Sequence, residues 1–377
     1  MIKRIFHPIG QGAYYSERFK DFNIVYDCGN FHDTKLGDKV VKQSFRRNDE
    51  IDILFISHFD KDHISKIKTL KDHIKKIHRV VMPLLDKEER ILLANVYRAL
   101  DFDDIVELVN NPKLFFGEKT NIIKVKETDN PNEPISREPE LDENKKDEYN
   151  IDKDLIKDIV IPSGSKLITK FDWVYMPYNH KYNTRNKQLK EELKNEGFDV
   201  EKLKNNEDYT LHEIAKDISI NPASIGRKFN KIYKKLDGTI NENSMLLFSG
   251  PIISNHPKRI RRRIYQNTFF PFYYPVYYLN EIACIFTGDS DLTKILIKDI
   301  FQHYWNDVGT IQIPHHGSIN NFNSEILEDK NYCCPISFGL NNNFGHPSSK
   351  IIADILSNHC CPFLVTEKTN STYTEIM

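Results

Sequence analysis

The sequence predicts an α/β sandwich, because short apolar, strand-like segments alternate with helix-like stretches near both ends of the chain. The clearest strand is Ile51–Ser57, in which five of seven residues are apolar and which a charged loop follows at once. The chain has 377 residues, 39% of them hydrophobic, and this is enough apolar material for a large core. A largely disordered chain is therefore excluded.

The charge balance excludes a globally basic nucleic-acid coat, since 53 Lys and Arg face 54 Asp and Glu and the net charge is −1. No apolar run approaches the roughly 18 residues that span a bilayer. The N-terminal MIKRIFHPIGQG lacks the features of a signal peptide. We therefore expect a soluble, cytoplasmic protein that does not contact a membrane.

The expected elements follow one another in a regular order. After the strand Ile51–Ser57 we expect a helix at Ser65–Ile77 and a strand at Arg79–Pro83. The C-terminal part repeats this rhythm, with expected strands at Ile282–Thr287, Thr310–Ile313, Tyr332–Phe338 and Pro362–Thr366, and helices at Leu292–His303, Ser324–Lys330 and Ser348–Asn358.

The middle of the chain differs, so we expect one domain over residues 1–377 with two insertions. Residues 126–157 are rich in charge and proline and predict an exposed loop. Residues 184–237 predict a charged helical subdomain. Within it, a segment with a turn at Asn221–Pro222 superficially resembles a helix-turn-helix, although an ordinary helical hairpin that covers the core explains its apolar positions as well.

The six cysteines predict no structural zinc knuckle, because they lack C-x-x-C spacing. Cys28 and Cys284 are single, whereas Cys333–Cys334 and Cys360–Cys361 are adjacent pairs. We interpret them as small buried hydrophobic residues.

The segment SHFDKDHI, from Ser57 to Ile64, carries the strongest chemical signal. It places four metal-binding side chains within six residues directly after a buried strand: His58, Asp60, Asp62 and His63. Imidazole and carboxylate groups are ligands for Zn²⁺ or Mn²⁺, and four in one turn can reach two adjacent ions. We expect one ion at His58 and Asp60 and the other at Asp62 and His63; the alternative is a charged surface turn.

This turn resembles the H-x-[HD]-x-D-H signature of the metallo-β-lactamase fold, in the H-x-D-x-D-H form of the ComEC-like branch of DNA-uptake proteins and related phosphodiesterases. Further segments resemble motifs of the same group in the expected order: HPIGQGA with IVYDCGN, NENSMLLF, IFTGDSD, IPHHGS and FGHP. The resemblance implies an αββα sandwich with two divalent metal ions, Zn²⁺ or Mn²⁺. The middle of the chain is unmatched.

The late motifs supply the other implied metal ligands. Asp289 ends an apolar strand and could bridge two cations, or cap the following helix. The resemblance makes one of His315 and His316 a ligand; we favour His315, and His316 is a catalytic candidate or a buried, hydrogen-bonded histidine. Asp27 is expected to brace the metal loop.

Three further residues carry expected roles near the reaction. Asp62 would orient the nucleophile while it binds metal, and His346 would assist the leaving group as an acid or cation. The alternative for His346 is a helix-capping loop residue. Ser318 is a turn or cap residue, or else a phosphate contact.

Many proteins of this fold supply one more histidine in mid-chain. His180 is the best-placed candidate, because it ends a strand-like run. His73 and His78 look like surface residues.

A basic run at Lys258–Arg263 has five basic residues in six and precedes eight aromatic residues between Tyr265 and Tyr278. Such a combination suits phosphates and unstacked bases, so we expect Arg261, Arg262 and Arg263 to bind substrate. The alternative is a hairpin that packs its aromatic residues on the core.

The sequence thus predicts a metal-dependent phosphodiesterase, and the resemblance favours a nuclease acting on DNA. It also implies a role in bacterial antiviral defence beside an ATPase partner. One alternative is a hydrolase of small phosphodiesters, cyclic nucleotides, thioesters or lactams. The other is a nucleic-acid-binding regulator with a vestigial metal site.

Overall fold

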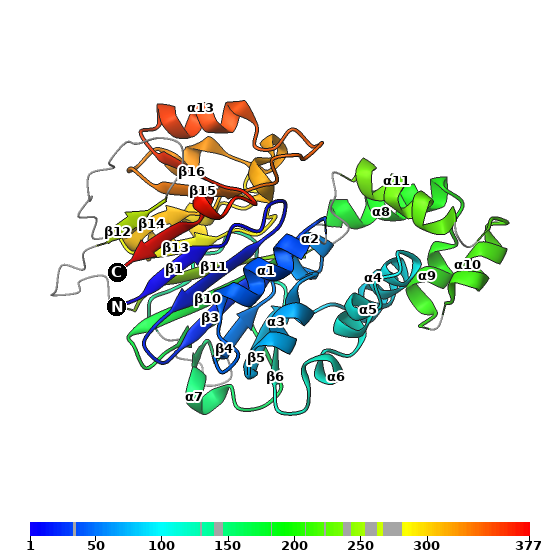
Figure 1. The fold of residues 1–377 in the computed structure, drawn as a ribbon, viewed down its shortest axis with the longest axis horizontal. Helices are drawn as coiled ribbons and strands as arrows, with labels where there is room; N and C mark the ends of the chain where they lie inside the picture. Colours follow the sequence, from blue (N-terminus) through cyan, green and yellow to red (C-terminus); the bar gives the residue numbers. More distant parts are fainter. Residues whose placement is uncertain are drawn as a thin grey trace.

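Two β-sheets pack face to face in the computed structural model, with helices on their outer faces (Figure 1). The structure describes residues 1–32, 35–128, 130–138, 146–181, 183–207, 209–221, 224–236, 243–252, 262–266 and 281–377. Among them, the first sheet has nine strands in the order β12 (Arg263–Tyr265), β17 (Tyr373–Ile376), β1 (Lys3–Phe6), β2 (Tyr14–Arg18), β3 (Asn23–Cys28), β4 (Glu50–Phe55), β5 (Lys76–Pro83), β6 (Asn121–Val125) and β8 (Ile159–Ile161). From β3 to β8 its strands are parallel.

The second sheet has eight strands within the same described residues. Their order is β16 (Cys361–Val365), β15 (Cys333–Ser337), β14 (Val308–Ile311), β13 (Ala283–Phe286), β11 (Asn243–Pro251), β10 (Trp173–Lys181), β9 (Lys166–Ile168) and β7 (Glu148–Asn150). Strands β13 to β16 are parallel, so their carboxyl ends lie at one edge. The loops that carry the late motifs start from this edge.

The helices fall into groups that cover different faces. On the first sheet lie α1 (Lys35–Ser44), α2 (Lys61–Ile64), α3 (Ile67–His73), α4 (Lys87–Ala99), α5 (Asp103–Asn110) and α6 (Pro112–Phe116). The second sheet carries α12 (Ile297–Ile300), α13 (Ser349–Ser357) and short 3-10 turns at Trp305–Asp307, His315–Gly317, Ile319–Asn321 and Ser324–Leu327. A further 3-10 turn lies at Thr369–Ser371. The expected helix at Leu292–His303 is therefore mostly turn, and the one at Ser324–Lys330 is a single 3-10 turn.

Four helices form a projection at one side of the molecule, which we call the helical lobe: α8 (Asn183–Asn195), α9 (Val200–Asn205), α10 (Leu211–Asp217) and α11 (Ile225–Lys235) (Figure 1). The residues Ile214, Ala215, Ile225, Phe229 and Ile232 are buried in the same apolar cluster as α4 and α5. The helices α10 and α11 thus pack against the core as an ordinary helical hairpin does, and the apolar side of neither is exposed as a recognition helix. Pro222, in the expected turn, lies outside the described residues.

The charged insertion at 126–157 is only partly the exposed loop that its composition predicts. Its end forms β7 and the short helix α7 (Ile151–Asp154). Tyr149 and Ile151 are buried between the sheets, because β7 pairs with β9 and extends the second sheet. Burial of these two apolar side chains accompanies the formation of β7 as an edge strand within an otherwise polar segment.

Among the described residues, the structure contains no helix that is both long and apolar enough to cross a membrane.

Candidate metal centre

The turn from Ser57 to His63 connects β4 to α2, on the side of the sheets that faces the helical lobe (Figure 1). Two glycines allow the turn to approach the N-terminal strands closely. A Cβ atom on Gly29 would lie 2.4 Å from the backbone of Asp62 and His63, and one on Gly12 would lie 2.8 Å from the Asp62 carbonyl oxygen. The backbone of Ala13 donates to that same oxygen at 3.0 Å. The glycine motifs thus fix the position of the metal-binding turn.

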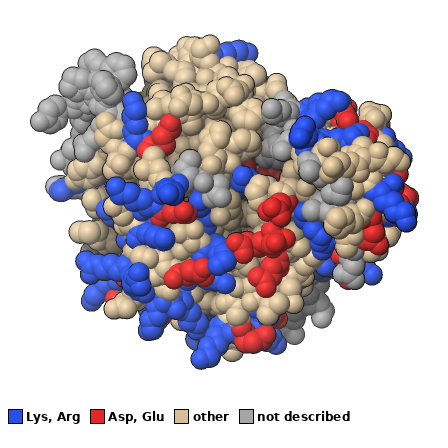
Figure 2. Space-filling view, turned by 45° about the vertical axis from the view of Figure 1, so that its right-hand side comes forward, with Lys and Arg blue, Asp and Glu red and all other residues tan. Residues whose placement is uncertain are grey.

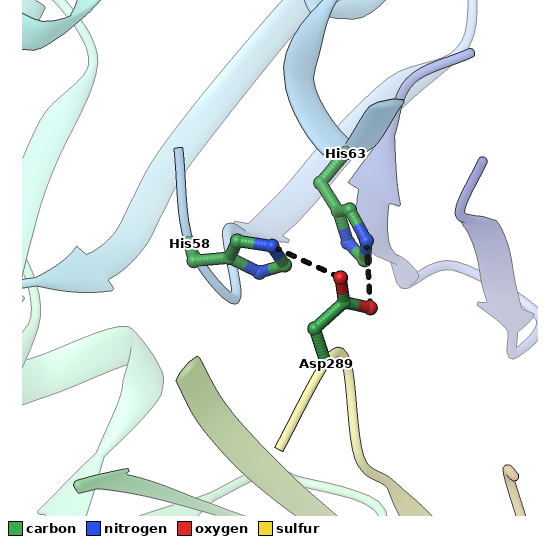
Figure 3. Close-up of side chains that lie close together, drawn as sticks. All are labelled: His58, His63 and Asp289. Atoms are coloured by element: carbon green, nitrogen blue, oxygen red, sulfur yellow. Dashed lines mark ion pairs between the residues drawn. The ribbon is translucent and has the colours of Figure 1, made fainter. Parts of the chain in front are cut away.

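Asp289 lies between the rings of His58 and His63 (Figure 3). Its Oδ1 atom is 3.1 Å from Nε2 of His63, and its Oδ2 atom is 3.6 Å from Nε2 of His58. Oδ2 also lies 3.8 Å from Nε2 of His315. Asp289 follows β13, whereas the first two histidines follow β4, so one carboxylate joins the ends of both sheets. This placement fits the expected bridging ligand better than a helix cap.

A second cluster lies beside the first and shares His63 with it. Asp62, His63 and His316 place their ligand atoms within 4.8 Å of one another, as do His58, His63 and Asp289. The Oδ2 atom of Asp62 is 2.9 Å from Nε2 of His316. The structure thus brings His316, rather than the favoured His315, to the Asp62 cluster, while His315 lies on the Asp289 side.

Both histidines after Pro314 have an unusual backbone. His315 and His316 have φ angles of 46° and 56°, in a region that few non-glycine residues occupy. Hydrogen bonds then orient each ring: Nδ1 of His315 lies 3.0 Å from Oδ1 of Asn321, and Nδ1 of His316 lies 2.8 Å from the carbonyl oxygen of Ser337. Each Nε2 atom therefore points toward a carboxylate.

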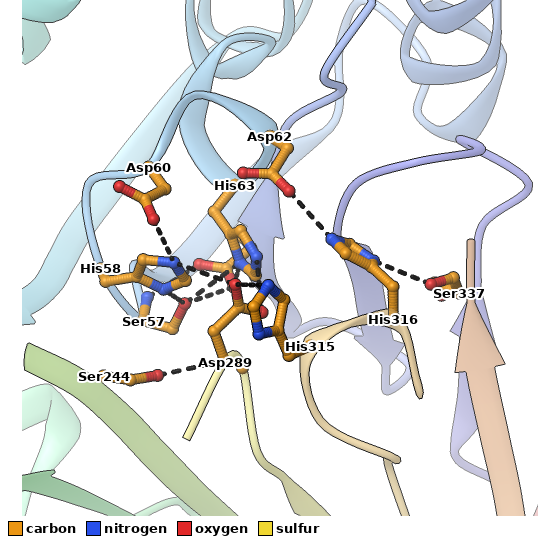
Figure 4. A network of polar contacts seen from close by, with 12 residues as sticks. Ser57, His58, Asp60, Asp62, His63, Ser244, Asp289, His315, His316 and Ser337 are labelled. Atoms are coloured by element: carbon orange, nitrogen blue, oxygen red, sulfur yellow. Dashed lines mark hydrogen bonds and ion pairs between the residues drawn. The ribbon is translucent and has the colours of Figure 1, made fainter. Parts of the chain in front are cut away.

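Asp27 braces the turn, as the sequence predicted, through three contacts. Figure 4 shows the polar network around Ser57, His58 and His63, to which these contacts belong. The Oδ1 atom of Asp27 accepts the backbone N–H of Ser57 at 2.7 Å, and its Oδ2 atom accepts the Ser57 hydroxyl at 2.6 Å. Oδ2 also lies 2.8 Å from Nδ1 of His63. The Ser57 Oγ atom is in turn 2.8 Å from Nδ1 of His58. One carboxylate thus orients both histidines, directly or through Ser57.

The buried charges shift the pKa values of these groups in opposite directions. Burial and His63 disfavour the charged form of His58, but the ion pairs with Asp289 and Asp60 outweigh them and raise its pKa to about 9. Against the effect of burial, the carboxylates of Asp289, Asp27 and Asp62 raise the pKa of His63 well above its usual value. The pKa of Asp289 is well below its usual range, because His315 and His63 outweigh its burial.

The residues present fit divalent metal ions. The Oδ1 atom of Asp62 is buried and makes no hydrogen bond to the described residues. The buried Nε2 atoms of His58 and His63 face carboxylates at 3.1–3.6 Å without a hydrogen bond of good geometry. Such atoms are costly in a protein interior unless an ion or another partner satisfies them. Asp60 lies beside His58, with Oδ2 3.6 Å from Nε2 of His58, but neither cluster includes it, so the expected pairing of His58 and Asp60 on one ion stays a prediction. Imidazole and carboxylate groups are ligands that suit Zn²⁺ or Mn²⁺.

His346 lies at the edge of the centre rather than in either cluster. Its ring centroid is 5.5 Å from that of His315 and 6.4 Å from that of His316. Burial, together with these two histidines, lowers the pKa of His346 to about 4. Both effects disfavour the charged form of the ring, and the expected role as an acid or cation stays a prediction. Ser318 is buried, and its N–H donates to the His315 carbonyl at 2.9 Å.

His180, the mid-chain candidate, ends up on β10 opposite Ser244 of β11. Ser244 accepts the backbone N–H of Asp289 at 3.1 Å, so His180 is one strand away from the bridging residue. Neither of the two clusters found among the described residues includes it.

Of the basic run, the structure describes Arg262 and Arg263. Arg262 is buried, and its guanidinium pairs with Glu375 and donates to the carbonyl oxygen of Glu281 at 3.1 Å. Glu281 precedes β13 and Asp289 follows it, so Arg262 is bound at the opposite end of this strand from Asp289. The prediction that Arg262 binds substrate is therefore wrong, since its buried guanidinium neutralises the charge of Glu375 inside the core. Arg263 is exposed on β12, and Arg261 lies outside the described residues.

The face of the molecule in Figure 2 carries both positive and negative side chains. Figure 2 shows Lys and Arg interspersed with Asp and Glu, and a hollow between the body of the molecule and the helical lobe at the right. The visible described surface around this hollow has no continuous basic stripe.

Sequence reasoning missed the residues that orient the ligands from a distance. Ser57 and Asn321 act through hydrogen bonds to ring nitrogens. Ser57 directly precedes the first histidine, and this adjacency was a usable signal. Asn321 and the Ser337 carbonyl come from other loops and could be recognised only in the folded chain.

A match to a family model agrees with this architecture. Residues 13–164, less than half of the chain, match the family model described as the metallo-beta-lactamase superfamily. The matched segment contains the His58–His63 turn, and Asp289 and the late histidines lie beyond it. Proteins of this superfamily are in general metal-dependent hydrolases that bind divalent metal ions, often zinc.

Among solved structures, one match is the crystal structure of the metallo-beta-lactamase fold protein YhfI from Bacillus subtilis. The identity is 12%, the match covers 48% of this chain and 54% of that chain, and the TM-score is 0.21. The chain thus spans about half the length of that protein. The comparison with curated proteins finds no match. The two sheets with outer helices agree with the metallo-β-lactamase fold, which confirms the fold class that the sequence predicts.

Proposed function

We propose that this protein is a metal-dependent phosphodiesterase, and that its substrate is DNA. The observation that carries the proposal is the pair of His/Asp clusters that share His63. Adjacent sites of this kind suit in-line displacement at phosphorus, because two divalent cations supply charge that stabilises the attacking and the leaving oxygen and lower the pKa of water. The preference for DNA comes from the motifs that resemble the ComEC-like branch.

Individual side chains of the centre have different proposed roles in the reaction. Asp62 lies between His63 and His316, so it can hold the nucleophile in line while it binds metal. Asp289 holds the ends of both sheets at a fixed separation. His346 lies beside both late histidines at the edge of the centre, so it can assist the leaving group by a hydrogen bond.

A hydrolase of small phosphodiesters is the second candidate, and one observation favours it. Arg262 is buried at the opposite end of β13, so a cation that was expected to bind a long nucleic acid contributes nothing to such binding. Unlike a long nucleic acid, a small phosphodiester has no further phosphates that would need to bind to a row of basic residues.

The experiment that tests the proposal is a cleavage panel with Zn²⁺ or Mn²⁺, and with a chelator as a control. The substrates are single- and double-stranded DNA, RNA and a chromogenic phosphodiester. We expect the metal-loaded protein to cleave DNA, and Asp62→Asn to reduce the rate about 100-fold or more. Asp72→Asn, at an exposed residue of α3, is the matched control. Cleavage of the chromogenic ester alone would favour the small-substrate candidate.

The proposal is wrong if the metal-loaded protein hydrolyses none of these substrates, or if Asp62→Asn cleaves at the wild-type rate.

A further inference from the structure

A series of aromatic rings leads from the metal centre toward the surface. His346 stacks at 30° on His316, with ring centroids 6.4 Å apart. Phe344 stacks on His346 at 26° and 5.9 Å. Phe31 meets Phe344 edge-on at 5.8 Å, and the exposed His32 lies beyond it at 5.2 Å. Each step is within the range of direct ring contact.

Phe344 is not a core residue of the ordinary kind. It is half-buried, and within the described chain it belongs to none of the three apolar clusters that form the interior. Its backbone N–H donates to Oδ1 of Asn342 at 3.1 Å, and the N–H of His346 donates to the same oxygen at 3.1 Å. The Asn342 amide also donates to the carbonyl oxygens of Gly339 and His346. One side chain thus holds the loop that presents both rings.

The loop leaves room beside these rings. Apart from these two neighbours, a Cβ atom on Gly345, the residue between them, would meet no described atom within 4 Å. The next exposed apolar side chains are Leu340 in the same loop and Ile319 after the His315–Gly317 turn. On its inner side Phe344 contacts His346, which in turn contacts the two late histidines of the metal centre.

We propose that Phe344, supported by His346 and Phe31, is a stacking platform for a nucleobase attached to the scissile phosphodiester. The inference rests on the proposed function and narrows its substrate class to nucleotide esters. A phosphate at the clusters would place its sugar and base one or two ring lengths away, where the platform lies. Stacking on an aromatic face requires no particular base, so we expect recognition of bases with little sequence preference.

The test separates base stacking from phosphate binding. Short single-stranded DNA oligonucleotides carry 2-aminopurine at successive positions, and matched oligonucleotides carry a base-free sugar there. Binding is measured by fluorescence in Asp62→Asn, which keeps the oligonucleotides intact. We expect quenching at one position, and a loss of affinity of about tenfold when that base is absent.

The Phe344→Leu change, made in the same background, should abolish the quenching and weaken binding of the base-bearing oligonucleotide about tenfold, without affecting the base-free one. Phe31→Leu, which leaves Phe344 in place, should cause a smaller loss. Phe171→Leu, at another half-buried ring, just before β10, is the matched control and should change nothing. Thermal unfolding verifies that each variant is folded.

The platform is refuted if no position is quenched, if wild-type and Phe344→Leu bind both oligonucleotides alike, or if neither oligonucleotide binds. The proposed function is judged separately, by hydrolysis in the metal-loaded wild-type protein. Hydrolysis without any dependence on the base would remove the platform and leave the phosphodiesterase standing.

Discussion

Nδ1 of His63 lies 2.8 Å from Oδ2 of Asp27, and Nε2 of the same ring lies 3.1 Å from Asp289. The carboxylate of Asp27 accepts the Nδ1–H of the ring, so Nε2 is the nitrogen that can bind a metal ion once its proton is released. Asp27 belongs to β3 and His63 to α2, and the contact therefore connects the orientation of a ligand to the first sheet.

Asp27→Asn should lower the affinity for Zn²⁺ by about 10- to 100-fold, because an amide cannot accept all three hydrogen bonds that the carboxylate accepts. Titration calorimetry with Zn²⁺ measures the effect. Asp52→Asn on the adjacent strand β4 is the control, since Asp52 accepts a backbone N–H of Asn23 away from the clusters. Unchanged affinity in Asp27→Asn would mean that Asp27 does not orient the ligands.

Gly29→Ala should weaken Zn²⁺ binding and lower the free energy of unfolding by about 1–3 kcal/mol, because the new methyl group would overlap the Asp62–His63 backbone. Gly226→Ala in α11 is a matched control: its methyl group would lie 3.7 Å from the nearest atom, the Ala99 carbonyl oxygen. Urea unfolding and metal titration of both variants make the comparison. Wild-type behaviour of Gly29→Ala would show that the turn can shift without cost.

Arg262→Met should destabilise the fold by about 3–5 kcal/mol, because it leaves the buried Glu375 without one of its two cations. Metal affinity should stay at the wild-type value, since Arg262 lies at the other end of β13. Arg263→Met, at an exposed neighbour, should change the free energy of unfolding by less than about 0.5 kcal/mol. A reduced rate of cleavage in a stable Arg262→Met protein would restore the substrate role that its burial contradicts.

Glu375 should make the stability depend on pH in the acid range. Burial opposes its ionisation, but Arg262 and Arg4 lower its pKa to about 2, from the usual value of 4.5. A depressed pKa gives stabilisation that is complete above pH 4.5 and is lost as the pH falls toward 2. The difference in unfolding free energy between wild-type and Glu375→Gln should therefore shrink by roughly 1.4 kcal/mol per pH unit below 4.5. Urea unfolding between pH 6 and 3 measures it, and a constant difference would contradict the account.

The parts of the site that one segment carries were predictable from the sequence. His58 to His63 follow a buried strand within a single turn, and Asp289 ends another strand, so local pattern places them at strand ends. The choice between His315 and His316 was not predictable in this way. Their positive φ angles redirect both side chains, and local sequence gives no sign of that conformation before a glycine.

Long-range partners account for the other errors. Arg262 looked like a solvated cation in a basic run, but Glu375, 113 residues further along the chain, pairs with it inside the core. Residues 148–154 looked like loop because charged residues surround Tyr149 and Ile151, and the edge of the second sheet buries these two side chains. In both cases contacts with residues far away in the sequence decide whether a side chain is buried, and the local sequence does not show these contacts.

The number of metal ions per chain tests the central claim most directly. After dialysis against Zn²⁺ or Mn²⁺, elemental analysis of the wild-type protein should find about two ions per chain. Asp289→Ala should lose most of this metal, because Asp289 contacts both histidines of its cluster, whereas His346→Ala should keep it. Equal metal content in Asp289→Ala and the wild-type protein would contradict the bridging role and, with it, the metal centre described above.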